Sequence, residues 1–523
     1  MVVLKEIIGR MENQVRLNQS DTARRVLLIP ARLQLDDSTY LFFILIAGGL
    51  LRFLTLGRQS LWVDEGLSYW IANQSWADLL VDLQTSVRPL HFVILHFMIL
   101  LGGSEWMLRA PSAIAGVISL VLFYALVAEF FDRKTGLLAA LLLAISPFHV
   151  WYSQEARMYA IECMFMLAAS LFAVRGLRKN RWWDWCLFGL FEGLTLLSET
   201  GGIWFVLSFN FAAGLIFFFK RQTGKFWSWV FSQAIAFIEY LPILINVPGA
   251  MKSGDTDWIP PATIAGLFRL VVDFVGGHYH SVLQGIAVLA VLLILFSAAA
   301  SRLVDDYQMH PNRYIILVSW LVLPVGISFL ISQEYFKVPL RDLFFAPGVY
   351  IFLNRNLITV MFPLYILIAR GLILTRREIG ILVLTSIISL SFIAYIQNNL
   401  KTTKENFRAA ASLVSRREME GDTIVLAPDI LEAPFAYYYN DRALMRGKPA
   451  GIFRDGLIDA SRNDRQISLQ NALEHSHRVW LITSRNIYQG DRKGISKEVE
   501  AIGEKLDEVH FQEVQVDLFL MEP

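Results

Sequence analysis

Eleven apolar stretches, each close to the length that crosses a lipid bilayer, restrict the chain to a polytopic membrane fold. A helix needs about 20 mainly apolar residues to span the hydrocarbon core. With 55% hydrophobic and 18% charged residues, the composition is too apolar for a water-soluble protein. The stretches lie at 40–56, 111–131, 137–151, 158–174, 185–198, 202–219, 226–246, 281–300, 314–331, 356–374 and 380–395.

The distribution of basic residues predicts the orientation of these spans. Lysine and arginine are retained on the cytoplasmic side, and here every second loop is basic. A further apolar run at 89–101 is short and carries His91 and His96. If this run does not cross, the basic loops and the basic N-terminal tail all share one side. We therefore expect it to be a re-entrant or interfacial segment on the outer side. The basic loops lie at 133–134, 175–181, 220–225, 302–313 and 376–377.

This orientation divides the chain into three parts. We expect a cytoplasmic N-terminal tail at 1–38, a transmembrane domain at 39–396, and a soluble extracytoplasmic domain at 397–523. In the last part, a helical pattern at 406–417 precedes β-rich segments, and helix-period stretches lie between them. The fold class is thus an α-helical membrane protein with a small α/β domain outside. The strand candidates are 423–426, 478–483 and 514–520, and the helix-period stretches are 469–475 and 497–506. The outer loops of the transmembrane domain are 57–110, 152–157, 247–280 and 332–355.

Carboxylates in two outer loops are the first candidates for chemistry. Asp64 and Glu65 open a segment with apolar and aromatic residues at helical spacing over 67–76, which predicts an interfacial helix. Their ordinary role there is to complement the helix dipole. Glu155 and Arg157 lie in the second outer loop, where a local ion pair is the ordinary explanation. Because charge near a bilayer is costly, two such loops together favour a site for a substrate or ion.

The remaining outer segments add histidines and basic residues. His278 and His280 have a spacing that suits metal binding on a strand, but no third ligand is defined, so the metal requirement stays open. Glu199 lies at the outer end of a predicted span and is a candidate to line a cavity, although pairing within the helix bundle is the ordinary role. The fourth outer loop contributes Lys337, Arg341 and Arg355. The formal net charge of +1 argues against a nucleic-acid partner.

Several short motifs occur in the order found in one family of membrane enzymes. They begin with Leu61-Trp62-Val63-Asp64-Glu65 and extend over about a hundred residues. On these residues the chain resembles the GT-C class of glycosyltransferases, in the family (glycosyltransferase family 39) that includes protein O-mannosyltransferases and the aminoarabinose transferases of lipid A. The family often has histidine or tyrosine near the outer end of the fifth span, whereas this chain has Ser198-Glu199-Thr200. The other motifs are Arg88-Pro89-Leu90-His91, Leu108-Arg109-Ala110-Pro111-Ser112, Thr135 to Ala140, Ser146-Pro147-Phe148-His149, Ser153 to Tyr159, and Asn354-Arg355-Asn356-Leu357 with Pro363, where Asn356 replaces a tyrosine.

The resemblance implies a GT-C fold and inverting transfer of a monosaccharide from a polyprenyl-phosphate carrier to an acceptor hydroxyl. A hydroxyl is a weak nucleophile, so a carboxylate must take its proton, and Asp64 is the candidate base. The departing phosphate needs preorganised cations, which guanidinium groups grip well. The catalytic candidates are Asp64, Glu65 and Glu155, with Glu65 orienting the acceptor or the loop and Glu155 binding the sugar or fixing the site. The phosphate-binding candidates are Arg88, Arg157, Lys337, Arg341 and Arg355, and the substrate-pocket candidates are His91, His149, Tyr159, Glu199 and His278.

The expected partners are a polyprenyl-phosphate-linked sugar, membrane lipid, and an acceptor that is a lipid, a glycan or a protein. Some relatives in the class use a divalent cation and others do not, so a divalent cation stays an open cofactor. We expect a bacterial plasma (inner) membrane location with the site outside the cytoplasm. A transporter or lipid flippase is the alternative, but that class favours two related halves with midplane polar groups. A scaffold whose outer domain binds a partner is a third hypothesis.

Overall fold

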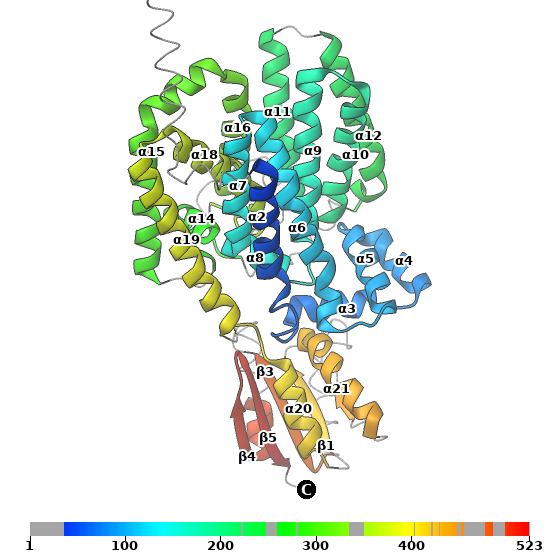
Figure 1. Cartoon of the computed structure of the whole chain (residues 1–523). Coiled ribbons are helices and arrows are strands. Elements are labelled where there is room, and N and C mark those ends of the chain that lie inside the picture. The colour runs from blue at the N-terminus through cyan, green and yellow to red at the C-terminus, as the bar shows by residue number, and fades with distance from the viewer. Residues whose placement is uncertain are drawn as a thin grey trace, which may run out of the picture. The chain divides into compact units, whose positions relative to one another are not determined.

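Helices make up most of the computed structural model, and strands are confined to the C-terminal region (Figure 1). The structure describes residues 36–220, 223–246, 259–278, 281–333, 350–401, 403–419, 422–427, 429–446, 451–453, 476–484 and 497–521. Residues 44–523 form one compact unit. The elements before residue 401 are α2 (Asp37–Phe53), α3 (Val63–Ala72), α4 (Trp76–Thr85), α5 (Pro89–Leu100), α6 (Glu105–Phe130), α7 (Arg133–Ile145), α8 (Pro147–Ser153), α9 (Tyr159–Lys179), α10 (Trp182–Ser198), η1 (Thr200–Gly202), α11 (Ile203–Lys220), α12 (Thr223–Leu244), α14 (Ile264–Gly276), α15 (Val282–Met309), α16 (Pro311–Ile331), η2 (Ile358–Val360), α18 (Met361–Leu374) and α19 (Arg377–Leu400).

Within the described residues, six helices are long and apolar enough to cross a membrane. A seventh candidate is the pair α7 and α8, which is bent by 62°. The other predicted stretches fall on helices that do not meet this length and composition, so the number of eleven crossings stays a prediction. The short run at 89–101 forms α5, and the segment at 67–76 is divided between α3 and α4. The six are Glu105–Phe130, Tyr159–Lys179, Thr200–Phe219, Val282–Met309, Pro311–Ile331 and Arg377–Asn399.

The bend between α7 and α8 has a local cause in Ser146 and Pro147. Proline suits the first position of a helix, because its fixed φ is helical and the missing N–H has no intrahelical acceptor there. The Ser146 hydroxyl caps α8 by accepting from the His149 N–H at 3.1 Å. The helix therefore restarts in a new direction and leads into the turn at 154–158 before α9.

A five-stranded mixed sheet forms the C-terminal region, with the order β2-β1-β3-β5-β4. Strand β1 runs parallel to β2 and β3, while β5 runs antiparallel to β3 and β4. Helix α20 packs on β5 and on α21, and Figure 1 shows it along the sheet. The elements are α20 (Phe407–Arg417), β1 (Asp422–Ala427), η3 (Asp429–Leu431), α21 (Glu432–Arg446), β2 (Gly451–Phe453), β3 (Arg478–Ser484), β4 (Gly503–His510) and β5 (Val514–Met521).

The predicted helix at 406–417 and the strands at 423–426, 478–483 and 514–520 are confirmed. The stretch at 469–475 lies outside the described residues. The helix prediction for 497–506 is wrong from Gly503 onward, where β4 begins. Strand β4 pairs only with β5 and alternates weakly between half-buried and exposed positions. Pairing with a buried neighbour, rather than its own apolar pattern, therefore determines its conformation.

Two hydrophobic cores matter for the site. The larger one lies within the helix bundle, where Phe205, Trp320 and Phe362 pack together. The second core combines the segment that leads into α3 with the C-terminal region, because Leu61 and Val63 belong to the same buried cluster as α20, α21 and the sheet. This shared core connects α3 to the C-terminal region.

Candidate active site

Helix α3 carries both predicted acids in its first turn, and the helix separates them. Consecutive residues on a helix point in different directions. The Asp64 side chain is 25% exposed, whereas Glu65 is fully buried. The two carboxylates therefore lie in different surroundings, one partly exposed and one buried, although they are adjacent in sequence.

Asp64 lies between two guanidinium groups from distant segments. Its Oδ2 is 3.4 Å from Arg355 Nη1 and 3.6 Å from Arg157 Nη2. Arg157 also donates through Nη1 to the Asp64 carbonyl at 3.2 Å and to Ser68 Oγ at 2.9 Å. The structure thus brings together one predicted base and two predicted phosphate ligands from three segments. A cation pair of this kind can hold a phosphate as readily as it holds a carboxylate.

Arg88 and Glu199 form a second pair beside this cluster. Arg88 precedes α5, and its Nη1 is 3.2 Å from Glu199 Oε2. Glu199 ends α10, and its other oxygen accepts from the backbone N–H and hydroxyl of Thr200 at 3.0 and 2.7 Å. His91, in the first turn of α5, is buried near the charges of Arg157 and Arg88. These sequence candidates therefore lie in one neighbourhood.

A buried acid that the sequence did not single out belongs to the same region. Glu162, in the first turn of α9, is 1% exposed, and neither carboxylate oxygen has a hydrogen-bond partner among the described residues. The Glu162 carboxylate is near enough to Glu199 for their negative charges to interact. It also lies close to Gly201 of η1. Buried polar atoms without partners are rare in native proteins, and each calls for an explanation. A ligand that donates hydrogen bonds would supply one here.

Glu65 belongs to a buried ionic cluster directly behind Asp64. Arg109 of α6 donates to both Glu65 oxygens, at 2.8 Å through Nε and 2.6 Å through Nη2. The backbone N–H of Ala156 and Lys404 Nζ contact the same carboxylate at 2.8 and 3.3 Å. Burial alone would raise the pKa of Glu65, but the charges of Arg109 and Lys404 lower it to about 2. Glu65 is thus a charged structural anchor.

Lys404 also joins this cluster to Glu155. Its Nζ lies 3.2 Å from Glu155 Oε1 and 5.1 Å from the ring centre of Trp151. Burial raises the pKa of the Glu155 carboxyl, and the Lys404 charge opposes that rise. The second Glu155 oxygen is buried without a hydrogen-bond partner. Lys404 is therefore the cation in direct contact with Glu155 among the described residues, and Arg157 acts on it from a greater distance.

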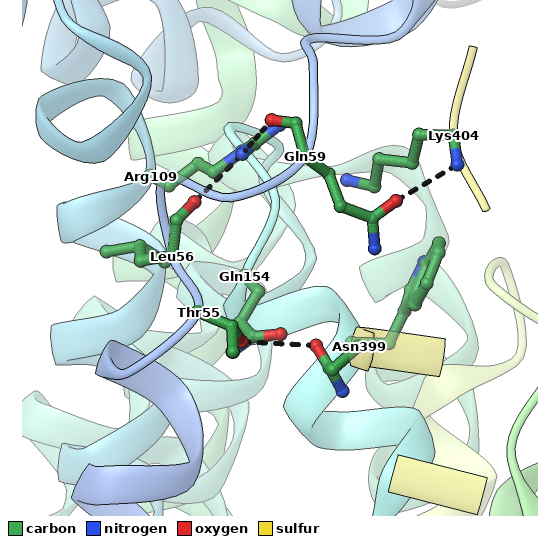
Figure 2. Close-up of a pocket in the computed structure, with 8 residues that line it drawn as sticks. Thr55, Leu56, Gln59, Arg109, Gln154, Asn399 and Lys404 are labelled. Atoms are coloured by element: carbon green, nitrogen blue, oxygen red, sulfur yellow. Dashed lines mark hydrogen bonds between the residues drawn. The ribbon is translucent and has the colours of Figure 1, made fainter. Parts of the chain in front are cut away.

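Figure 2 shows the small cavity beside these groups. Gln59 connects Arg109 to the backbone of Lys404. Its backbone carbonyl accepts from the Arg109 guanidinium at 2.9 Å, and its side-chain oxygen accepts from the Lys404 backbone N–H at 3.0 Å. Gln154 donates to the Thr55 hydroxyl at 2.9 Å on the other wall. The cavity volume is about 10 Å³, which is close to the space of one water molecule. This part of the structure is packing for the site and leaves no room for a sugar.

The remaining predicted residues lie in different surroundings. His149 contacts Arg52 through Nδ1 at 2.8 Å inside the bundle. Tyr159 is buried near Arg157 and Arg355, with its ring 4.8 Å from Tyr152. His278 packs against Phe148, Trp151 and Tyr152. Lys337, Arg341 and His280 lie outside the described residues. Among the residues that the structure describes, no three His, Cys, Asp or Glu side chains gather as metal ligands.

Sequence reasoning did not single out Arg109, Glu162 or Lys404, nor Glu405, which is buried next to Lys404 and close enough to Asp64 for their charges to interact. Arg109 offered a signal, because an arginine at the start of the long apolar run of α6 needs a buried anion. Glu162 offered the same signal in α9. Lys404 and Glu405 offered none, since they follow the last apolar helix in a short polar segment.

Comparison with known proteins finds one family match for part of the chain and several solved structures of similar fold. Residues 87–245 match the family described as dolichyl-phosphate-mannose-protein mannosyltransferase. ArnT from Cupriavidus metallidurans bound to undecaprenyl phosphate has the same fold, with a TM-score of 0.58 and 11% identity over 92% of this chain and 98% of that chain. Its apo state gives 0.56 and 13% over the same shares. The oligosaccharyltransferase of Archaeoglobus fulgidus in the apo form gives 0.54 and 11% over 87% and 70%.

No curated protein matches the sequence. The similarity of the chain as a whole therefore rests on the solved structures, and the similarity of residues 87–245 also rests on the family match. The family match covers Arg88 and Glu155, whereas Asp64 precedes it. Residues 87–245 therefore resemble the matched family, and the chain as a whole has the fold seen in ArnT and in the Archaeoglobus fulgidus oligosaccharyltransferase.

Proposed function

We propose that the protein transfers a monosaccharide from a polyprenyl-phosphate carrier to the hydroxyl of an acceptor, with inversion at the sugar C1. One observation carries the proposal: Asp64 Oδ2 lies 3.4 Å from Arg355 and 3.6 Å from Arg157, although the three residues come from separate segments. An acid and two guanidinium groups are the groups that this reaction needs. The fold shared with ArnT bound to undecaprenyl phosphate supports a lipid-linked donor.

The arrangement suggests how donor binding prepares the base. In the structure, Asp64 is the anion held by Arg157 and Arg355. A donor phosphate placed against the same guanidinium groups takes over this pairing and leaves a carboxylate oxygen to accept a hydrogen bond from the acceptor hydroxyl. The acceptor oxygen then bonds to C1 as the bond from C1 to the phosphate oxygen breaks. The hydroxyl proton passes to Asp64, and polyprenyl phosphate leaves with its charge held by arginine.

Other candidates take supporting roles in this proposal. Arg88 is the third guanidinium near the phosphate, and its pairing with Glu199 orients it. The unpaired Glu162 carboxylate supports a pocket for sugar hydroxyls, because hydroxyls would donate to it. Lys337 and Arg341 stay predicted phosphate ligands. The buried contacts of Glu65 favour its orienting role for the loop over contact with the acceptor.

The membrane arrangement completes the proposal. We place residues 1–38 in the cytoplasm, 39–396 in a bacterial plasma membrane, and 397–523 outside, with the site at the outer surface. The alternation of basic loops supports this orientation. Labelling of the Asp78 region from outside intact cells tests it, because α4 belongs to the same outer loop and Asp78 is exposed.

The decisive experiment supplies the purified protein with a panel of radiolabelled polyprenyl-phosphate sugars and a membrane extract. We expect one donor to label an acceptor, and we expect Asp64→Asn to lower that rate by about 10²- to 10⁴-fold while the protein still accumulates. Asp78→Asn is the matched control, because Asp78 lies exposed on α4 and should keep the full rate. Full transfer by Asp64→Asn would remove the proposed base. Movement of labelled lipid across the membrane without a product would favour the transporter.

A further inference from the structure

The segment after the last membrane helix enters the ionic cluster behind Asp64. Lys404 lies between α19 and α20 and is 8% exposed. Its ammonium group lies 3.3 Å from Glu65 and 3.2 Å from Glu155. These two acids belong to α3 and to the turn before α9. A single cation from the C-terminal region therefore joins the two segments that supply Asp64 and Arg157.

Helix α21 holds the same helix α3 from its other side. The backbone N–H of Leu61, just before α3, donates to the Tyr438 hydroxyl at 2.7 Å. Pro434 lies so close to Gly66 that a Cβ added to this glycine would meet its backbone at 2.6 Å. The Tyr69 and Tyr437 rings meet edge to face at 4.7 Å. The C-terminal region thus contacts the α3 segment at Leu61, Gly66 and Tyr69.

Lys404 compensates the charge of Glu155, which the other contacts between α3 and the C-terminal region do not. Glu65 has a bidentate partner in Arg109 without Lys404. Lys404 is the cation that contacts Glu155 among the described residues. Removal of Lys404 would leave Glu155 without the cation that contacts it, with Arg157 and Arg355 acting only at longer range. A buried charge that loses its partner is strongly destabilised. Glu155 is two residues from Arg157, so its displacement moves the guanidinium that faces Asp64.

We infer that Lys404 is a positioning residue: it fixes α3 to the turn at Glu155 so that Asp64 and Arg157 meet, which makes the C-terminal region part of the catalytic unit. The catalytic consequence rests on the function proposed above, whereas the positioning of Asp64 does not. The two parts are therefore tested separately.

The first test measures transfer kinetics with the donor found in the panel and the full-length chain. We expect Lys404→Met to lower kcat by about 100-fold, because a displacement of about 1 Å at a reacting group has an effect of this size. The KM for the donor should change much less, since Arg88 and Arg355 keep their places. Lys401→Met is the matched control, because Lys401 is exposed three residues earlier and should retain the full kcat. Equal kcat for Lys404→Met and the unaltered protein would overturn the inference.

The second test needs no substrate and no activity. Cysteine is placed by Asp64→Cys in a chain whose Cys163 and Cys186 are replaced by serine, and the rate of its modification by a water-soluble maleimide is measured. We expect Lys404→Met to raise this rate by at least about tenfold, because loss of a buried cation loosens the N-terminal turn of α3. Adding Glu155→Gln should restore the slow rate, since it removes the charge left without a partner.

The two tests separate the two possible failures. If no polyprenyl-phosphate sugar is transferred by the unaltered protein, the proposed function fails, while the maleimide rates still decide the role of Lys404. Equal maleimide rates with lysine and methionine at position 404 would show that Lys404 does not position Asp64. A rate that rises in Lys404→Met but is not lowered by Glu155→Gln would also contradict the inference, because the effect would then not pass through Glu155.

Discussion

Glu405 makes the stability of this protein depend on pH in a way that the structure specifies. The residue follows Lys404 and is 7% exposed. Burial raises the pKa of the Glu405 carboxyl from its ordinary 4.5 to about 7. Hydrogen bonds from its own N–H and from that of Val63 oppose the rise, and the charge of Asp64 adds to it. The protonated form is therefore the one that the fold prefers.

The sign and size of the effect follow from this raised pKa. A carboxyl whose pKa is higher in the folded chain than in the unfolded chain stabilises the fold fully below its unfolded pKa. This contribution is lost as pH rises through the folded pKa of about 7. Each pKa unit corresponds to about 1.4 kcal/mol. The rise from 4.5 to about 7 thus corresponds to a loss of about 3 kcal/mol between acid and mildly alkaline pH.

Glu405→Gln removes this dependence, because glutamine has the shape of the protonated acid and does not ionise. We expect the unaltered protein and Glu405→Gln to have similar thermal midpoints near about pH 5, and the variant to become the more stable one above about pH 7. Thermal unfolding in detergent over a pH series measures the gap. Glu504→Gln, at an exposed position of β4, is the control and should show no such divergence. A gap between Glu405→Gln and the unaltered protein that stays constant with pH would refute the reasoning.

Two further predictions concern the contacts around α3. Arg109→Met should lower the free energy of unfolding by about 3–5 kcal/mol, because it leaves Glu65 buried without its bidentate partner. Urea unfolding measures this change, and a loss below about 1 kcal/mol would contradict the prediction. Gly66→Ala should cost about 1–3 kcal/mol and lower transfer, because the new methyl group meets the backbone of Pro434 at 2.6 Å. Gly214→Ala is its control in thermal unfolding, since nothing lies within 4 Å of that position, and equal midpoints for the two variants would count against the close contact.

The fold of the C-terminal region shows how far local patterns reach. Strands β1, β3 and β5 are nearly continuous in burial, and their β-branched and aromatic residues predict them correctly. Strand β4 has acidic and basic residues on both faces, so its spacing is as compatible with a helix as with a strand. Its partner β5 decides between the two. Long-range pairing of this kind is not visible in a local window of sequence.

Some residues of the candidate site can also be found from local sequence, and others cannot. The sequence singles out Asp64, Arg157 and Arg355 as candidates, because each is a charged residue between apolar stretches, where charge is costly and tends to be kept for function. The structure places the three side chains together. Their family motifs then supply the roles. Lys404 is not predictable in this way, because it lies in a polar segment typical of a solvated linker. Only the folded chain shows that this segment is buried against Glu65.

The ionic bond between Lys404 and Glu65 joins residues 339 positions apart, and this separation has a consequence for biosynthesis. When α3 leaves the ribosome, its cationic partner and the tyrosines that contact it have not yet been synthesised. Glu65 cannot form its contact with Lys404 until the chain has been synthesised at least as far as residue 404. Chains that terminate before residue 404 would therefore lack the cation that contacts Glu65 and the tyrosines that contact the α3 segment.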